Sequence, residues 1–277
     1  SEMCISDSSN IFLPRQEKTG NNRLRFYTSD PDFTRKYFHV GNCFNFRHYE
    51  YDILTIPIQD TRDCTLENIV IYSSPGSGFV GNGDIRGLHL KGCRVTVRPG
   101  TSRSVSTATD CLHVCNSQGN FIIEDCDFGY AGDDCINIHD NSSMGIQLLD
   151  SHTLIARRVT RESVLFETGY PVELRNPDLS PTGFSSILTD VQYSPRTETC
   201  RLTFRDALPE GLSPDTVLWN KRFSTQNYII RGCRFTNNRA RGVLLQGSNG
   251  MLVNNLFENI QGAAIQIETG CESRWSE

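Results

Sequence analysis

The amino-acid sequence predicts an all-β fold, wound as a parallel β-helix. Short β-type runs recur about 22 residues apart, as Tyr228–Phe235 and Gly250–Phe257 show. Glycine and asparagine, which tolerate left-handed bends, punctuate these runs. A fixed period of this size is typical of a solenoid, whose coils stack because none can bury its apolar face alone. Leucine-rich repeats have similar periods, but their leucine and asparagine spacing is missing here, so a parallel β-helix fits better.

Four parts of the chain are expected in order. Residues 1–50 are poorly periodic and are predicted to form an N-terminal cap with the first strands, since a solenoid needs its open end covered. Residues 51–152 form the first part of the β-helix. Residues 153–225 break the repeat with prolines between short strands, which indicates an inserted small antiparallel β-barrel-like segment. Residues 226–277 continue the β-helix, and we expect this part to be truncated.

Strand alternation predicts one inward and one outward column of side chains. The inward column is aliphatic: Leu112, Val114, Ile136, Ile138, Val243, Leu245, Ile265 and Ile267. The outward column is rich in hydrogen-bonding groups: Cys111, His113, Cys115, Cys135, Asn137, His139, Gly242, Leu244, Gln246, Ala264, Gln266 and Glu268. Parallel strands lie about 4.8 Å apart, so the outward groups form a ladder along which a sugar could lie.

Three aspartates are the candidate catalytic groups. Asp110 precedes Asp134 by 24 residues, and Asp133 is adjacent to Asp134. If successive coils stack, the three carboxylates crowd one surface, and crowding separates their pKa values as acid–base cleavage of a glycosidic bond requires. Asp133 and Asp134 can both reach the cleft only if the backbone bends, and Gly132 is a plausible place for the bend. The alternative is that these aspartates cap turns or bind calcium between coils.

Eight residues are candidates for substrate contact: His113, Asn137, His139, Arg241, Gln246, Gln266, Glu268 and Trp275. Arg241 starts a strand equivalent to that of Asp134, so it either orders the carboxylates or contacts substrate. The alternative is a solvated arginine or a salt bridge to an acid. Trp275 is a candidate stacking platform for the apolar face of a sugar, or a capping aromatic. The others are outward ladder residues, which could equally be surface groups without a role.

Cysteine usage and charge restrict the function classes. The 11 cysteines include no Cys-x-x-Cys pair, which argues against a zinc ribbon and a fully paired disulfide framework, and we expect stacked small core residues and no metal. The alternative is a zinc site at His113 and His139 with Cys111, Cys115 and Cys135 nearby, which the lack of finger-like cysteine spacing disfavours. A net charge of −5 without a basic face gives no reason to expect nucleic acid, and no apolar run suits membrane insertion. We expect a secreted or periplasmic protein whose signal peptide is absent from this chain, and leave a homo-oligomer open.

The motifs around the aspartates resemble those of glycoside hydrolase family 110. The likeness rests on Thr109-Asp110-Cys111-Leu112-His113, on Gly132-Asp133-Asp134-Cys135-Ile136-Asn137-Ile138-His139, and on the segments 238–246, 263–267 and 275–277. It covers most of the chain from about Phe46. The resemblance implies an inverting exo-α-galactosidase that acts on terminal α-1,3-linked galactose on a right-handed parallel β-helix. It also implies that Asp110, Asp133 and Asp134 are the catalytic carboxylates. Cys111 and Cys135 stand where the family often has alanine.

Two other interpretations of the function remain. A more distant resemblance links the Gly-Asp-Asp-Cys stretch to polygalacturonases of family 28, but their Gly-His-Gly and Arg-x-Lys segments are missing. A polygalacturonase-like hydrolase, or another β-helix lyase or epimerase, is the enzyme alternative. The second alternative is a non-catalytic glycan-binding solenoid, which the three crowded carboxylates disfavour. The acid–base reaction needs no cofactor, and the expected partner is a galactose-terminated oligosaccharide or glycoconjugate.

Overall fold

The computed structural model describes residues 2–4, 10–12, 15–27, 31–41, 45–47, 53–159, 165–269 and 275–276. Within these ranges the regular structure is almost wholly β, and most of the strands lie in parallel sheets. The exception to the predicted all-β class is one short helix, α1 (Pro31–Tyr37). Pro31 has the fixed φ that suits a first helical turn, and Asp32 and Arg35 lie at the ends that the helix dipole favours for their charges.

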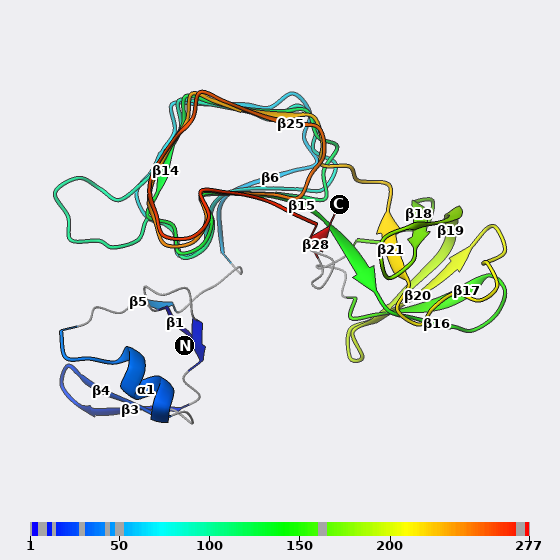
Figure 1. Cartoon of the computed structure of the whole chain (residues 1–277), viewed down its shortest axis with the longest axis horizontal. Coiled ribbons are helices and arrows are strands. Elements are labelled where there is room, and N and C mark those ends of the chain that lie inside the picture. Colours follow the sequence, from blue (N-terminus) through cyan, green and yellow to red (C-terminus); the bar gives the residue numbers. More distant parts are fainter. Residues whose placement is uncertain are drawn as a thin grey trace.

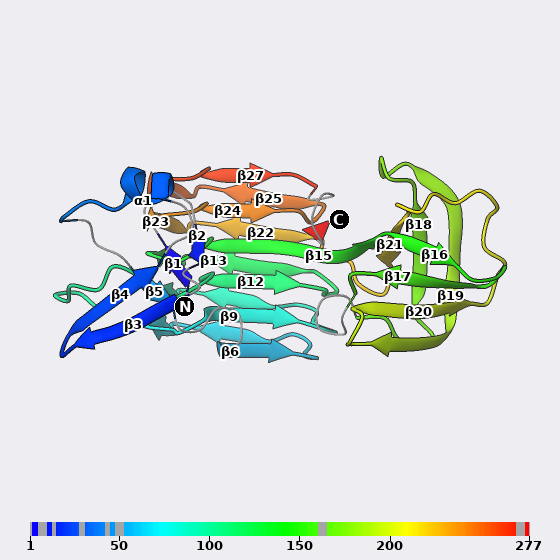
Figure 2. The same ribbon diagram turned by 90° about the horizontal axis from the view of Figure 1, so that it is seen from below.

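Three parallel sheets run along one stack of coils (Figures 1 and 2). The first contains β7 (Thr65–Glu67), β10 (His89–Lys91), β13 (Phe121–Glu124), β22 (Tyr228–Arg231) and β25 (Gly250–Val253). The second contains β8 (Val70–Ile71), β11 (Arg94–Val95), β14 (Asp127–Gly129), β23 (Arg234–Asn238) and β26 (Leu256–Ile260). The third contains β6 (Leu54–Gln59), β9 (Ser77–Asn82), β12 (Leu112–Cys115), β15 (Ile136–Met144), β24 (Val243–Leu245) and β27 (Ile265–Ile267). This arrangement is consistent with the predicted parallel β-helix.

The registers between coils follow the sequence repeats. Tyr228 pairs with Gly250 and Val243 with Ile265, each at the predicted offset of 22 residues. His113 pairs with Asn137 at the offset of 24. Phe121 pairs with Tyr228 across the non-repeating segment, so the chain leaves the stack and returns to the same sheet.

Most of the predicted inward column forms the core of the stack. Leu112, Val114, Ile136, Ile138, Val243 and Leu245 are all buried in one hydrophobic cluster. The prediction is wrong for the last described coil, where Ile265 and Ile267 are 46% and 74% exposed. Both continue the register, but in the described part of the chain β27 pairs only with β24, so its other side is uncovered.

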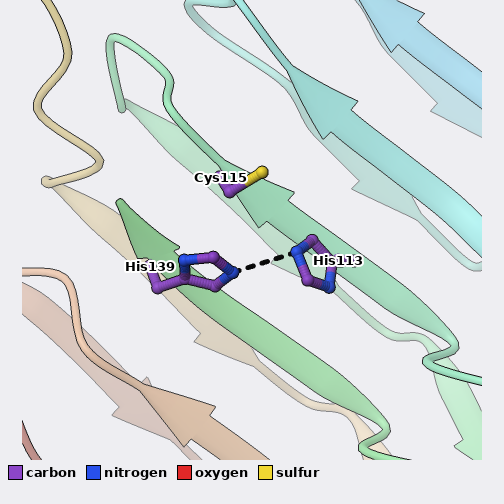
Figure 3. Close-up of side chains that lie close together, drawn as sticks. All are labelled: His113, Cys115 and His139. Atoms are coloured by element: carbon purple, nitrogen blue, oxygen red, sulfur yellow. Dashed lines mark hydrogen bonds between the residues drawn. The ribbon is translucent and has the colours of Figure 1, made fainter. Parts of the chain in front are cut away.

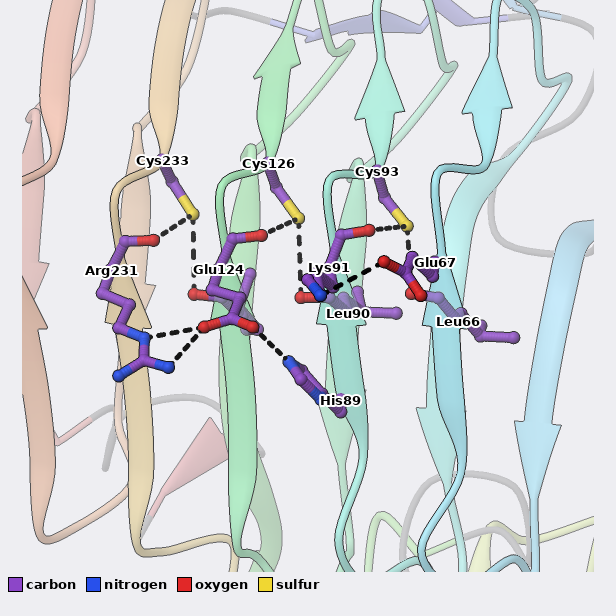
Figure 4. Close-up of polar contacts among 11 residues, drawn as sticks. Leu66, Glu67, His89, Leu90, Lys91, Cys93, Glu124, Cys126, Arg231 and Cys233 are labelled. Atoms are coloured by element: carbon purple, nitrogen blue, oxygen red, sulfur yellow. Dashed lines mark hydrogen bonds and ion pairs between the residues drawn. The ribbon is translucent and has the colours of Figure 1, made fainter.

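Cysteines stack inside the core, as the sequence predicts. Cys93, Cys126 and Cys233 lie one coil apart, and each thiol donates to backbone carbonyl oxygens (Figure 4). The outward placement of Cys111 and Cys135 is wrong, because both are fully buried in the core. These two residues precede β12 and β15 at a bend, where the strict alternation of a strand does not hold.

An antiparallel region lies beside the stack and has a hydrophobic core of its own (Figure 1). Its strands pair in the order β16 (Ile146–Leu148), β17 (Thr153–Arg157), β20 (Thr199–Phe204), β19 (Pro181–Ser194), β18 (Pro171–Arg175) and β21 (Val217–Asn220). β15 joins the two regions, because it pairs in parallel with β12 and antiparallel with β21. The predicted domain boundaries stay predictions.

Short strands and the helix α1 form the regular structure in the described part of the N-terminal region. β1 (Glu2–Cys4) pairs antiparallel with β2 (Asn10–Phe12) and β5 (Asn45–Arg47), and β3 (Arg15–Gly20) forms a hairpin with β4 (Arg23–Tyr27). β28 (Trp275–Ser276) lies antiparallel to β15. Among the described residues, no helix has the length and apolar character needed to cross a membrane.

Candidate active site

The three predicted carboxylates do meet at one place. One oxygen from each of Asp110, Asp133 and Asp134 lies within 4.8 Å of the others. Asp110 and Asp134 are buried, whereas the side chain of Asp133 is 27% exposed. Asp110 and Asp134 occupy equivalent places just before β12 and β15, so coil stacking brings them together. Asp133 is therefore the most exposed member of the group.

The bend at Gly132 is fixed by close backbone packing. A Cβ atom there would overlap the carbonyl oxygen of Ala108 and lie 2.7 Å from its carbonyl carbon, so only glycine fits. From the next coil, the buried Asn238 donates to the carbonyl oxygens of Asp133 and Arg241 at 2.7 and 2.8 Å. Its own side-chain oxygen accepts the Ala131 N–H at 2.8 Å. One amide thus holds two successive turns in place.

Arg241 pairs with Asp134, 107 residues earlier in the chain. Its Nε donates to Oδ1 at 2.8 Å and its Nη2 to Oδ2 at 3.0 Å, a bidentate contact, and Nη2 lies 3.9 Å from Asp133. Burial and the nearby Asp110 raise the pKa of Asp134 to about 7 despite this partner. Asp134 therefore exchanges its proton near neutral pH. The contact observed for Arg241 is a salt bridge to an acid, and that acid is one of the three predicted carboxylates.

A chain of hydrogen bonds runs from Asp110 through two histidines, and Figure 3 shows the contact between the two imidazole rings. His113 Nδ1 lies 2.6 Å from Asp110 Oδ2, and His113 Nε2 lies 3.0 Å from His139 Nε2. His139 Nδ1 lies 3.0 Å from the carbonyl oxygen of Asp140, which can only accept, so Nδ1 carries the proton.

Burial and the neighbouring His113 lower the pKa of His139 to about 3, so His139 is neutral and its Nε2 accepts. His113 must then donate from both nitrogens, which makes it an imidazolium beside Asp110. Burial acts to lower the pKa of His113, yet its contacts with Asp110 and Cys115 hold that pKa well above the usual value. His113 and Arg241 thus supply two positive charges against three carboxylates.

Asn137 and Gln266 lie in the outward ladder, in register with His113 and Leu244. The side-chain oxygen of Asn137 is buried and has no hydrogen-bond partner within the described ranges. An unpaired buried acceptor is costly, and substrate contact by Asn137 stays a prediction. No contact in the described structure joins Gln266 to the carboxylates.

The remaining predicted ladder residues lie at a different place. Gln246 and Glu268 line a cleft of about 540 Å³, together with Arg175 and Trp219 of the antiparallel region. Arg175 stacks on the Trp219 ring at 4.6 Å. None of the three aspartates lines this cleft. The backbone of Trp275 pairs with Asn141, and its side chain lies outside the described part of the structure.

Two positioning residues were missed by reasoning from the sequence. Asn238 and Arg239 fix the Gly132–Asp133 turn, Arg239 Nε by donating to the Gly132 carbonyl oxygen at 3.2 Å. Both lie in the segment that carries the family resemblance, next to Arg241, but only the structure reveals their contacts. The roles assigned to all the site residues stay predictions.

Comparison with known proteins agrees with the resemblance to glycoside hydrolase family 110. The chain is similar to curated alpha-1,3-galactosidases. It is 30% identical over 234 residues to alpha-1,3-galactosidase A of Shewanella woodyi, covering 83% of this chain and 38% of the relative. It is 28% identical over 266 residues to alpha-1,3-galactosidase B of Akkermansia muciniphila, covering 94% of this chain and 32% of the relative.

Alpha-1,3-galactosidase A of Bacteroides fragilis is 25% identical to the chain over 243 residues, 86% of this chain and 40% of the relative. The chain therefore spans less than half the length of these curated relatives. No family model matches the sequence. The more distant resemblance to polygalacturonases finds no support among these relatives.

Proposed function

We propose that this chain forms the catalytic part of an exo-acting α-galactosidase, on a right-handed parallel β-helix, that hydrolyses terminal α-1,3-linked galactose. The observation that carries the proposal is the cluster of three carboxylates from two successive coils, held by Arg241 and His113. The similarity to named alpha-1,3-galactosidases supports the substrate class. A galactose-terminated glycan is then the partner, and we propose a secreted or periplasmic location, where such glycans are met.

The exposure of the carboxylates suggests their roles. Asp133 reaches solvent, so it donates the proton to the glycosidic oxygen. The pKa of Asp134, about 7, suits a general base that takes a proton from water near neutral pH. Asp110 is held by His113 and by the Asp134 backbone N–H at 2.9 Å, and it orients that water.

Inversion of the anomeric centre is a separate part of the proposal. Inverting enzymes generally separate their two carboxyl groups by about 6.5–9.5 Å and retaining enzymes by about 5–5.5 Å. The closest oxygens here lie within 4.8 Å. Inversion therefore rests on the family resemblance, and the anomer first released decides it.

An NMR time course with α-1,3-galactobiose tests activity, linkage and stereochemistry together. We expect galactose to appear first as the β-anomer. First release of the α-anomer would contradict inversion but would still support the proposed α-galactosidase activity. An ultraviolet-absorbing unsaturated product from a uronate polymer would favour the lyase alternative. Glycan binding without product after long incubation would favour the non-catalytic solenoid.

Asparagine substitutions test the three acids one at a time. Asp110→Asn, Asp133→Asn and Asp134→Asn should each lower kcat by about 10²–10⁴-fold, the usual contribution of a general acid or base. Asp215→Asn changes an exposed carboxyl in the antiparallel region and serves as the matched control. A near-normal rate for any one of the three variants would remove that residue from the mechanism.

A further inference from the structure

We propose that His113, Cys115 and His139 form a binding site for one zinc-class divalent metal ion, directly behind the carboxylate cluster. One donor atom from each residue lies within 4.8 Å of the others (Figure 3). Imidazole nitrogen and thiolate sulfur are the ligand types that zinc and cobalt prefer. The proposal stands on its own and does not depend on the galactosidase activity.

The backbone places the three donors on one face. His113 and Cys115 are two residues apart on β12, so their side chains point to the same side of the sheet. Cys115 pairs directly with His139 on the neighbouring β15. The two Nε2 atoms lie 3.0 Å apart, close to the separation of about 3.3 Å expected for two nitrogens bound to one tetrahedral zinc ion.

The hydrogen bonds that the Nδ1 atoms of His113 and His139 make match those of histidines that bind a metal ion. A ligating histidine almost always donates its second ring N–H to a carboxylate or a backbone carbonyl. His113 Nδ1 makes this contact with Asp110 at 2.6 Å, and His139 Nδ1 makes it with the carbonyl oxygen of Asp140 at 3.0 Å. In each ring the remaining nitrogen, Nε2, points toward the shared position.

Cys115 differs from the structural cysteines of the stack. The thiols of Cys93, Cys126 and Cys233 donate to backbone carbonyl oxygens inside the core (Figure 4). Cys115 is buried but lies outside the core cluster, next to two imidazoles. A thiol beside imidazole nitrogens is suited to act as a ligand rather than as a small core residue.

Metal binding here releases two protons. One leaves His113 Nε2 and one leaves the Cys115 thiol, and both go to solvent, while Nε2 of neutral His139 binds without loss. His113 keeps its Nδ1 proton and its contact with Asp110. The ion would act as a positioning group for Asp110 through His113, and three protein ligands leave one coordination position open. Sequence spacing did not predict this site, because the ligands come from two coils.

Cobalt titration of the reduced, metal-free 277-residue chain tests the site without an activity assay. We expect one equivalent of Co²⁺ to bind per chain with a sulfur-to-cobalt charge-transfer band, which Zn²⁺ then abolishes by displacement. Cys115→Ser should remove the band and weaken Zn²⁺ binding by at least about 100-fold, because even the loss of an outer contact typically costs 10–100-fold. His139→Gln should weaken binding while the sulfur band remains at saturating Co²⁺.

Cys64→Ser is the matched control, since Cys64 is a partly exposed thiol outside the site, and it should keep both the band and the affinity. A second measurement needs no variant: Zn²⁺ should protect Cys115 in the unmodified chain from alkylation, as peptide mapping reads out. An equal band in Cys115→Ser and the unmodified chain overturns the proposal. So does alkylation of Cys115 that Zn²⁺ leaves unchanged.

Discussion

At the scale of single residues, the arginine that pairs with the buried Asp134 is the main electrostatic support of the site. Arg241 makes two charged hydrogen bonds to a carboxylate whose side chain is 1% exposed. Removing it leaves that carboxylate buried without its cation. We expect Arg241→Ala to lower the free energy of unfolding by about 1.5–3 kcal/mol and to lower turnover as well, measured by urea denaturation and galactose release.

Arg234→Ala is the matched control, because Arg234 pairs with Glu258 where both side chains are 56% exposed. Exposed pairs contribute about 0–1 kcal/mol, so its effect should be small. Arg241→Lys keeps the charge but cannot make the bidentate contact. We expect its loss of unfolding free energy and of turnover to lie between those of the two alanine variants. Equal effects of the two alanine substitutions would show that Arg241 does not compensate a buried charge.

The raised pKa of Asp134 predicts how stability and activity depend on pH. Burial and Asp110 hold this pKa at about 7 in the folded protein, above the ordinary value of 3.8 that applies when the chain unfolds. The folded state therefore binds more protons between these two pH values, so its stability falls as pH rises from about 4 to about 7. A general base must be deprotonated, so kcat/KM should rise over the upper end of the same range.

Urea denaturation at a series of pH values checks the stability part. Asp134→Asn cannot titrate, so its stability should vary less over this range, whereas the exposed-site control Asp215→Asn should keep the slope of the unmodified protein. A profile of Asp134→Asn that matches the unmodified profile would mean that another group controls the pH dependence.

At the scale of elements, the turn before β15 determines whether the acids can meet. Gly132 packs against the Ala108 carbonyl in the preceding coil, and backbone cannot move aside as a flexible side chain can. We expect Gly132→Ala to cost about 1–3 kcal/mol of stability through overpacking and to displace Asp133, with a fall in kcat that exceeds the effect on folding. Denaturation and kinetics of the same preparation separate the two effects.

Gly20→Ala is the control for the added methyl group. Gly20 has an ordinary φ, and its nearest neighbour would be an Arg23 side-chain carbon at 4.0 Å. The Gly20→Ala substitution should therefore leave both stability and kcat nearly unchanged. Full activity of Gly132→Ala would show that the turn has room to adjust and that the bend does not require glycine.

The sequence could predict those elements whose position is set by local pattern. Offsets of 22 and 24 residues and strand alternation were enough for the registers of β12 with β15 and of β22 with β25. Strand alternation predicted the wrong side-chain direction for Cys111 and Cys135, because these residues lie in bends and not in strands. The turn-holding contacts of Asn238 were out of reach, since they depend on side-chain directions and on a register across about 107 residues.

At the scale of the whole molecule, one buried junction ties the antiparallel region to the stack. The chain leaves the stack along β15 and returns just before β22, and Asp140 and Thr225 meet between these points. The Thr225 backbone N–H donates to Asp140 Oδ2 at 2.8 Å, and its hydroxyl donates to Oδ1. The same hydroxyl oxygen accepts the Ser117 N–H at 3.1 Å. One set of buried hydrogen bonds therefore joins Asp140, where the chain leaves the stack, Thr225, where it returns, and Ser117 of the preceding coil.

Replacing Thr225 by valine tests whether this junction couples the two hydrophobic cores. Valine keeps the shape but leaves the buried Asp140 carboxylate and the Ser117 N–H each without one partner, so we expect a loss of about 1.5–3 kcal/mol. Native-state hydrogen exchange should then accelerate both in β21 of the antiparallel region and in β22 of the stack.

Thr203→Val is the matched control, because among the described residues the Thr203 hydroxyl makes only a long 3.4 Å contact with Thr153 inside the antiparallel sheet. It should alter exchange there slightly and leave β22 unchanged. If Thr225→Val accelerates exchange in β21 alone, the antiparallel region opens independently of the stack. The carboxylate site would then depend only on the stacked coils, since Asp110, Asp134 and Arg241 all lie within them.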